Sequence, residues 1–573
     1  MQKHIINLRR SLVLYATILV LACSSSVFAS ATIIINNIDG PGEGFNDPTP
    51  AAPVGGNTGT TRGQQRLIAF TYAANIWGPT LDSNVPIVIQ AAFNPLPPNV
   101  LGSAGTIFIF SDFTGTGLYP GAEFPATWYG SALADKRAGA ELNPGAPDIN
   151  AQFSSNFNFY LGLDNNHGAQ PDLVTVLLHE FGHGLNFQTF VNASTGANPG
   201  GLTDIFARHV LDISNNLYWD QMTQAQRQAS ATRFGRVVWD GAAVNADVPN
   251  VLSFGSPEVR VLTPAGIAAP YQFGSAAFGP GLSSPGVTAS VINAVDPAEP
   301  PAPPLAAGTS TDGCSPFSNA AAVAGKIVLV ERGLCGFAVK ARNATNAGAV
   351  GVIIYNNAAN VNAAPPAMAD DFVNGAFVTI PTVSLTRANG LAILSQILTG
   401  TTAKIGIDLA VRAGADPAGH ARLFAPFPIL GSSSISHFDA VAFRNLLMEP
   451  TISGDLTRNL SAPDDLTLEL LRDVGWFPDA DLDGLADNFD CEPNSDVSAT
   501  LVIDGCNSGV PNFMFTSGCT LSDLIAHIGA TAKNHGQLVS GVSQLTNDLK
   551  KDGLITGAQK GAIQSCAAGA HIP

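Results

Sequence analysis

Charged side chains are scarce in this sequence. Only 12% of the 573 residues are Asp, Glu, Lys or Arg, about half the share that is usual in globular domains. The charge that is present is mostly negative, because 44 acidic residues stand against 27 basic ones and give a net charge of -17. This balance argues against nucleic acid and anionic membranes as partners. Its simplest consequence is solubility outside the cell.

Long apolar runs are missing after the first 29 residues. The N-terminus has a basic stretch, an apolar run from Leu12 to Ala22, and small residues before Ser30. This pattern is typical of a cleaved signal peptide, and its apolar run is too short for a stable membrane span. We therefore expect a secreted, extracellular protein without a stable membrane span. A periplasmic location and a lipid anchor on Cys23 are the less favoured alternatives.

Cysteine is absent between Ser30 and Gly313. A propeptide thiolate from this stretch therefore cannot hold the protein latent by binding a metal. Six cysteines follow, and an even number in an exported chain favours disulfide bonds. Proximity in the sequence predicts the pairs Cys314–Cys335, Cys491–Cys506 and Cys519–Cys566.

The sequence His179-Glu180-Phe181-Gly182-His183 is the strongest chemical signal in the chain. Asp172 and the apolar residues after it predict a helix that runs into this motif. Histidines four residues apart lie on one face of a helix, so both imidazoles can reach one zinc ion. Glu180 is suited to act as the general base that polarises a zinc-bound water.

A catalytic zinc needs three protein ligands and an open position for water. Six residues after His183, where some zinc peptidases have a third histidine, this sequence has Thr189. The third ligand must therefore come from elsewhere in the chain. His437 is the preferred candidate, and Asp204 and His209 are the alternatives.

His437 lies in Ser-His-Phe-Asp, and Met448 follows in Leu-Leu-Met-Glu-Pro. With these motifs the chain resembles the leishmanolysin family of metzincins. The resemblance implies His179, His183 and His437 as zinc ligands, and Met448 as an apolar floor under the zinc that does not ligate it. The sequence departs from the family at Thr189 and at Asn186, where the family has a glycine; Asn tolerates the left-handed backbone that such a turn needs.

Between about 255 and 411 the chain alternates short strands and helices in a β-α-β pattern. The stretch from Gly313 to Ile353 resembles the protease-associated (PA) domain. The resemblance implies an inserted, non-catalytic module that binds substrate or gates access to it.

A third resemblance concerns an acidic segment that ends at Cys491. It has the spacing of a twelve-residue calcium loop, with Gly484 at the sharp turn, and looks like a thrombospondin type 3 repeat. We expect it to bind a structural Ca²⁺ through Asp479, Asp481, Asp483, Asp487 and Asp490.

Together these features predict an α+β protein in which an inserted α/β PA-like domain splits a metzincin-like zinc peptidase domain. The predicted boundaries are 1–29 for the signal peptide, 30–254 for the first part of the metallopeptidase domain, 255–412 for the PA-like domain, 413–478 for the second part of the metallopeptidase domain, 479–507 for the calcium-binding repeat and 508–573 for a helical C-terminal module.

The predicted function is hydrolysis of peptide bonds in extracellular proteins by a secreted, zinc-dependent endopeptidase, with protein or peptide substrates as partners. The alternative is a non-catalytic calcium-binding surface or adhesion protein on a degenerate peptidase scaffold. The intact His179, Glu180 and His183 favour the enzyme, because a scaffold without activity has no physical need for all three.

Overall fold

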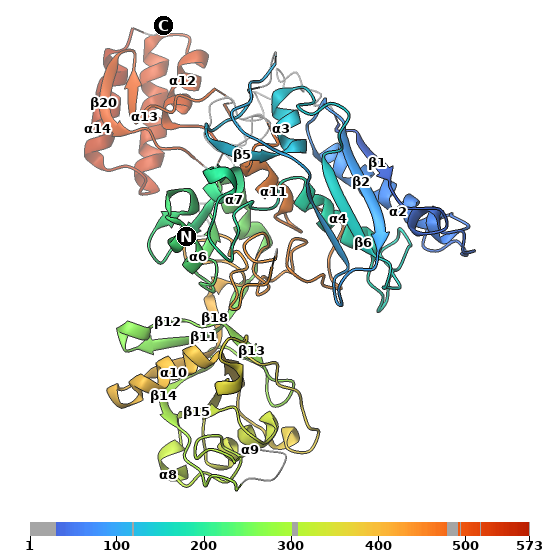
Figure 1. The fold of residues 1–573 in the computed structure, drawn as a ribbon. Helices are drawn as coiled ribbons and strands as arrows, with labels where there is room; N and C mark the ends of the chain where they lie inside the picture. Colours follow the sequence, from blue (N-terminus) through green and yellow to red (C-terminus); the bar gives the residue numbers. More distant parts are fainter. Residues whose placement is uncertain are drawn as a thin grey trace.

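The computed structural model describes residues 30–116, 120–300, 307–431, 433–477, 491–492, 494–515 and 517–571. The predicted signal peptide and all five predicted calcium ligands lie outside these residues. Figure 1 shows a large upper part that carries α4, a lower part built from the strands between β11 and β18, and a helical part at the C-terminus. None of the helices in the described ranges combines the length and apolar character needed to span a bilayer.

The large part is organised around a four-stranded sheet in the order β1-β2-β6-β3. The first three strands are parallel, and only the edge strand β3 is antiparallel to its neighbour. Its elements up to the PA insertion are β1 Ile33–Asn37, α2 Arg62–Trp77, β2 Ile87–Asn94, β3 Gly102–Thr106, β4 Ile109–Phe110, β5 Thr127–Gly130, α3 Ser131–Ala138, β6 Ile149–Ser154, α4 Leu173–Gly184, β7 Thr203–Asp204, α5 Ile205–Arg208, β8 Val210–Asp212, β9 Leu217–Tyr218, α6 Gln224–Ser230, β10 Val237–Trp239 and α7 Ala242–Val251.

The predicted fold class, α+β, is wrong: the parallel strands β1, β2 and β6 make the protein α/β. Parallel neighbours cannot be joined by a tight turn and need a crossover, which α2 supplies between β1 and β2. Helices α2 and α4 pack against the sheet through aromatic rings: Phe70 lies 4.9 Å from Phe153 on β6 and 6.0 Å from Phe181 on α4, centroid to centroid. The core under α4 is therefore apolar and closely packed.

The inserted part contains an eight-stranded sheet in the order β12-β11-β18-β14-β15-β16-β17-β13. The chain enters along β11 and leaves along β18, which pair antiparallel with each other. Its elements are β11 Phe254–Thr263, β12 Ala269–Pro270, β13 Phe273–Ser275, β14 Val287–Asn293, α8 Ala320–Val323, β15 Ile327–Glu331, α9 Phe337–Asn346, β16 Gly351–Tyr355, β17 Thr382–Leu385, α10 Arg387–Gln396 and β18 Thr402–Arg412.

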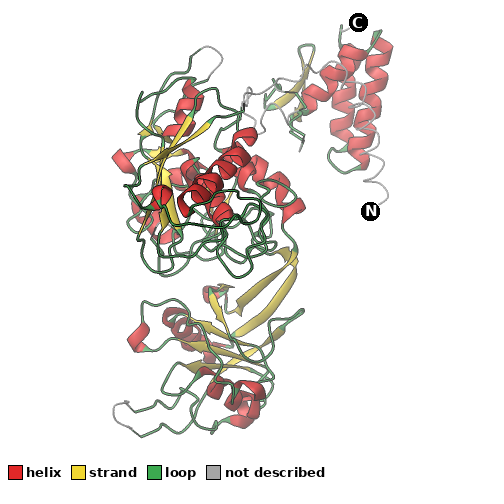
Figure 2. Ribbon diagram, turned by 90° about the vertical axis from the view of Figure 1, so that its right-hand side faces the viewer, coloured by secondary structure: helices red, strands yellow, loops and turns green. Residues whose placement is uncertain are grey.

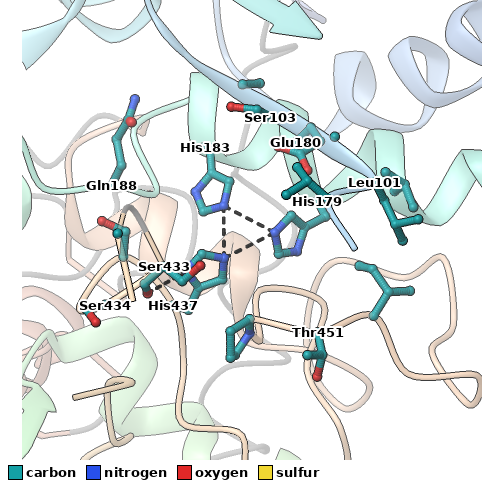
Figure 3. Close-up of a pocket in the computed structure, with 18 of the residues that line it drawn as sticks. Leu101, Ser103, His179, Glu180, His183, Gln188, Ser433, Ser434, His437 and Thr451 are labelled. Atoms are coloured by element: carbon teal, nitrogen blue, oxygen red, sulfur yellow. Dashed lines mark hydrogen bonds between the residues drawn. The ribbon is translucent and has the colours of Figure 1, made fainter. Parts of the chain in front are cut away.

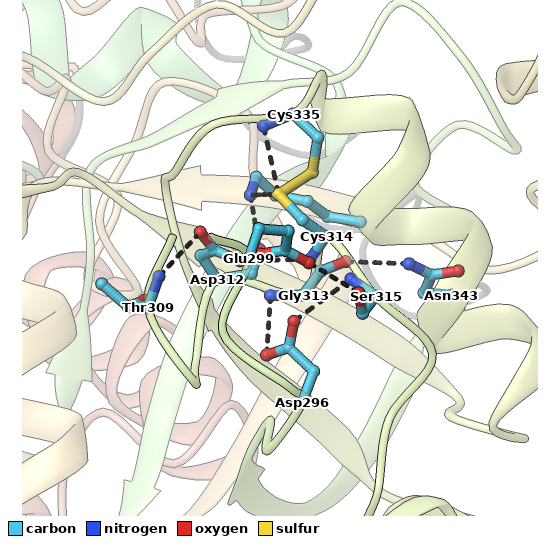
Figure 4. Close-up of a disulfide and its surroundings, with 10 residues drawn as sticks. Asp296, Glu299, Thr309, Asp312, Gly313, Cys314, Ser315, Cys335 and Asn343 are labelled. Carbon is cyan, nitrogen blue, oxygen red and sulfur yellow. Dashed lines mark hydrogen bonds between the residues drawn. A yellow bond between two sulfur atoms is a disulfide. The ribbon is translucent and has the colours of Figure 1, made fainter. Parts of the chain in front are cut away.

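Figure 4 shows the disulfide Cys314–Cys335 at one end of this sheet, which confirms the first predicted pair. The Nζ of Lys340, a fully buried lysine on α9, lies 3.3 Å from Cys314 Sγ. The main-chain N–H of Cys335 also donates to that sulfur. These contacts fix the start of α9 against the loop that precedes α8.

After β18 the chain returns to the large part and supplies α11 Thr467–Asp473. The Asp473 carboxylate accepts hydrogen bonds from the main-chain N–H groups of Ala243 and Val244 in the first turn of α7. Arg458 forms an ion pair with Asp172, 2.8 Å apart. The two segments on either side of the insertion therefore share one core.

The C-terminal part is a β-hairpin packed against three helices, seen at the upper right of Figure 2. Its elements are β19 Thr500–Ile503, β20 Cys506–Pro511, α12 Leu521–Thr531, α13 His535–Lys551 and α14 Gly557–Gly569. The predicted pairs Cys491–Cys506 and Cys519–Cys566 are wrong: the bonds are Cys491–Cys519 and Cys506–Cys566. The reason is that α14 packs against β20, which brings Cys566 to the start of that strand.

Candidate metal centre

Helix α4 carries the predicted motif, and both of its ends are fixed. Asp172 caps the N-terminus by accepting the Thr175 main-chain N–H at 3.0 Å. At the C-terminus Asn186 adopts a left-handed backbone with φ of 84°, and its Oδ1 accepts the N–H of Gly130 at 2.7 Å. The turn expected at Asn186 is therefore formed, with a side-chain contact that glycine could not make.

Three histidine side chains meet at the surface of this helix (Figure 3). The Nε2 atom of His183 lies 3.2 Å from that of His179 and 3.2 Å from that of His437, and the third side of the triangle is 3.3 Å. All three residues are at least 92% buried. The chain therefore brings together the two histidines of the motif and the preferred third candidate.

Each imidazole is oriented by a hydrogen bond from its Nδ1 to a main-chain carbonyl. The acceptors are Leu447 for His179, Phe187 for His183 and Ser433 for His437, at 2.7 to 2.8 Å. A proton held on Nδ1 leaves the lone pair of each Nε2 pointing into the centre of the triangle.

Electrostatics reinforces this arrangement. Burial lowers the pKa of His179 to about 4 and that of His183 to about 3, and it lowers the pKa of His437 well below its usual value. The three rings are therefore neutral near pH 7. Three lone pairs directed at one point in a buried site need a cation between them.

The size of the triangle fits zinc. A tetrahedral zinc ion with Zn–N bonds of about 2.0–2.1 Å has ligand nitrogens about 3.3 Å apart, which matches the observed 3.2, 3.2 and 3.3 Å. Three histidine ligands would leave zinc one further position. The donor set thus suits a zinc ion that keeps one position for water or substrate.

Glu180 lies beside the triangle and lines the same cleft. Burial raises the pKa of its carboxyl group to about 8, and a hydrogen bond from the main-chain N–H of Ala104 opposes that rise. A cation within about 4–6 Å would lower the pKa again. Glu180 therefore has the position and the adjustable basicity of a general base.

Met448 is fully buried and packs against α4 at Gly182, between Glu180 and His183. A Cβ atom added to Gly182 would lie only 2.9 Å from Met448 Sδ. Its neighbour Leu447 supplies the carbonyl that orients His179. Met448 is thus part of the apolar packing behind the motif.

The two alternative third ligands are occupied elsewhere. Asp204 caps α5 and accepts hydrogen bonds from Ala207 N–H and from the Thr189 hydroxyl. His209 stacks on Trp239 with ring centroids 4.9 Å apart. Both side chains serve local packing and not the histidine triangle.

The histidines lie in a cleft of about 840 Å³. In Figure 3 it extends past them on both sides, towards Leu101 and Thr451 on one and towards Gln188 and Ser434 on the other. Among the described residues that line it, Glu180 is the one acidic side chain, and none is lysine or arginine. Sequence reasoning missed the rest of this lining because those residues come from the edge strand β3 and from loops that carry no motif.

Comparisons with known proteins identify the insertion. Residues 300–393 match the family model described as the PA domain, which confirms the predicted PA-like module. ER degradation-enhancing alpha-mannosidase-like protein 3 of Homo sapiens is 41% identical over 96 residues, which are 16% of this chain and 10% of that protein. An aminopeptidase of Pseudomonas aeruginosa is 53% identical over 51 residues, 9% of this chain and 10% of that protein. The chain thus spans about a tenth of the length of these curated relatives.

Among solved structures, a zinc aminopeptidase from Bacillus subtilis is similar at 24% identity and a TM-score of 0.19. The overlap covers 29% of this chain and 35% of that one. A likeness of this size assigns no fold to the rest of the chain.

These comparisons contradict the resemblance to the leishmanolysin family of metzincins, and that family assignment is corrected. The family model that matches is that of the PA domain, and the similar curated peptidase is described as an aminopeptidase. The physical reason is that helix geometry and zinc chemistry alone can dictate a His-Glu-x-x-His pattern, so the pattern does not identify one family. Asn186 and Thr189, where the sequence departs from the leishmanolysin pattern, also count against that family.

Proposed function

We propose that this protein is a zinc-dependent endopeptidase. The observation that carries the proposal is the triangle of three neutral Nε2 atoms with the Glu180 carboxylate beside it. Three histidines, one open position and an adjacent carboxylate are the parts that zinc-assisted hydrolysis requires. The proposed zinc ligands are His179, His183 and His437.

The chemistry follows from the side chains. Zinc held at the triangle would supply a Lewis acid and lower the pKa of a bound water towards 7. Glu180 accepts the proton of the attacking water and passes it to the leaving amine. Because Glu180 is 93% buried, bulk water does not compete for that proton.

Cleavage within a chain, and not only at its end, is supported by the shape of the cleft. The lining continues on both sides of the histidines, so a peptide can extend in both directions. The edge strand β3 contributes Gly102, Ser103 and Ala104 to one wall, and β3 has a sheet partner on one side only. An open strand edge can bind an extended peptide through main-chain hydrogen bonds.

A second candidate is an aminopeptidase, which the names of the similar proteins favour. An aminopeptidase must hold the positively charged N-terminus of its substrate, and many use two metal ions held close together. Both requirements call for several carboxylates. The cleft offers Glu180 as its one acidic lining residue within the described part of the chain, so the endopeptidase is preferred.

The proposal is tested with casein and with an N-acetylated, internally quenched peptide, which an aminopeptidase cannot digest. We expect both to be cleaved, a chelator to stop cleavage, and zinc but not calcium to restore it. Glu180→Gln should keep zinc and lose at least about 100-fold in rate. The matched control Glu43→Gln changes an exposed carboxylate in a loop and should keep full activity. Full activity of Glu180→Gln would refute the mechanism.

We further propose that the enzyme acts outside the cell and on protein or peptide substrates. The three disulfides support export, because such bonds persist in oxidising compartments. The complete set of His179, His183, His437 and Glu180 argues against the non-catalytic adhesion protein considered as the alternative. Calcium binding by Asp479 to Asp490 stays a prediction from the sequence.

A further inference from the structure

The general base proposed above is held between helix α4 and the edge strand β3. The register of the sheet decides which main-chain groups of β3 it meets. Leu101 O accepts from Ser154 N–H, and Ile107 N–H donates to Asp148 O. The odd-numbered residues of this segment therefore turn their main-chain groups to β6, and the even-numbered Gly102 and Ala104 turn theirs towards the cleft.

The main-chain N–H of Ala104 is not paired with β6 and faces the carboxylate of Glu180. Glu180 is 7% exposed, so the carboxylate has few other positions to occupy. The edge strand is thus in direct contact with the proposed reacting group.

Because Gly102 has no side chain, there is room beside it for the carboxylate of Glu180. A Cβ atom built on Gly102 would come within 2.9 Å of both Cγ and Oε1 of Glu180, and within 3.1 Å of Cδ. The φ of Gly102 lies outside the left-handed range, so its backbone conformation does not demand glycine. Glycine weakens a strand and often marks a close approach of another group. The steric clearance for Glu180 explains why glycine stands here.

We propose that Gly102 is a positioning residue for the general base: its missing side chain, together with the Ala104 N–H, sets where the Glu180 carboxylate lies. This inference rests on the proposed endopeptidase function and goes beyond it. Any larger residue at position 102 would push the carboxylate away from the water that it must deprotonate. The three atoms nearest to a Cβ at Gly102 all belong to Glu180, so the general base is the first group that such a Cβ would displace.

The test compares Gly102→Ala with Gly105→Ala, Glu180→Asp and the double variant Gly102→Ala/Glu180→Asp. Gly105 is the matched control on the same strand, since its added Cβ meets only the flexible amide of Gln188, at 3.3 Å or more. Each protein is assayed for zinc content, kcat and KM on the acetylated quenched peptide. A displacement of about 1 Å can cost about 100-fold in rate.

We expect Gly102→Ala to bind zinc and to keep KM within about twofold while kcat falls about 10- to 100-fold. Gly105→Ala should keep kcat within about twofold, because its added Cβ lies nearest to the Gln188 amide and not to Glu180. Glu180→Asp keeps Cγ but removes Oε1 and Cδ from the three atoms that an added Cβ at Gly102 would meet. Adding Gly102→Ala to this variant should therefore lower kcat by a smaller factor than Gly102→Ala does alone.

Several results would overturn the inference. An unchanged kcat in Gly102→Ala would do so, as would an equal loss of kcat on the Glu180→Asp background. If Gly102→Ala fails to fold, restored folding in the double variant supports the clash with Glu180, and failure of the double variant contradicts it. Full activity of Glu180→Gln would instead refute the proposed function, so the two failures are distinguishable.

Discussion

The Nε2 atoms of His183 and His437 lie 3.2 Å apart although 254 residues separate them in the sequence. One histidine lies in α4, and the other lies in the segment that follows the PA insertion. The ion pair between Arg458 and Asp172 fixes that returning segment to the N-terminus of α4. The proposed zinc site therefore forms only when the two halves of the large part pack together.

Replacing His437 should remove one of three zinc ligands. We expect His437→Ala to lower zinc affinity by more than the roughly 10- to 100-fold that the loss of an outer-shell partner costs. The measurement is a competition titration against a zinc-binding dye. His209→Ala is the control, because His209 stacks on Trp239 outside the triangle. Equal zinc affinity of His437→Ala and the unchanged protein would contradict the ligand assignment.

Packing behind the motif gives a second prediction. Gly182→Ala would place a Cβ 2.9 Å from Met448 Sδ, and such overpacking costs about 1–3 kcal/mol. All five tryptophans lie in the large part of the chain, so their fluorescence reports its unfolding alone. The control is Gly454→Ala, whose added Cβ has only a ring carbon of His167 within 4.0 Å. Unchanged stability of Gly182→Ala would show that Met448 is not held tightly against α4.

A third prediction concerns pH. The Asp416 carboxylate, 3.0 Å from His420 Nδ1, raises the pKa of His420 above 6.5, and Asp240 at 3.6 Å adds to the rise. Because the folded state holds this proton more tightly, the pair stabilises the protein fully below pH 6.5 and loses its effect as pH rises through the raised pKa. The contribution is at most about 1 kcal/mol.

We therefore expect the difference in stability between the unchanged protein and His420→Asn to shrink as pH rises from about 6 to about 8. Urea unfolding followed by tryptophan fluorescence measures this difference at each pH. A difference that is constant over the range, or that grows with pH, would contradict the raised pKa.

The disulfide bonds give a fourth prediction. Non-reducing proteolysis and mass spectrometry should recover peptides that join Cys491 to Cys519 and Cys506 to Cys566. Recovery of Cys491 joined to Cys506 would contradict the packing of α14 against β20.

Structure that depends on neighbouring residues was predicted correctly from the sequence. The predicted helix after Asp172 is α4, since periodic apolar residues and a capping carboxylate act over a few residues. The left-handed turn at Asn186 was also predictable, because few residue types accept that backbone. His437 was found from the residues beside it, and its approach to His183 depends on tertiary packing.

What the sequence could not show depends on which distant segments meet. The parallel order of β1, β2 and β6 changed the fold class, and periodicity within a strand says nothing about the direction of its neighbour. The role of Gly102 was equally hidden. A glycine in a strand is a weak signal until Glu180 is seen to fill the space beside it.

The central claim is that one zinc ion is held by His179, His183 and His437. X-ray absorption at the zinc edge on the purified protein, with metal analysis of the same sample, tests it most directly. We expect one zinc per chain with three nitrogen neighbours at about 2.0–2.1 Å and one oxygen neighbour, and loss of this signal in His437→Ala. Two zinc ions per chain about 3.5–4 Å apart, or an unchanged spectrum in His437→Ala, would contradict it.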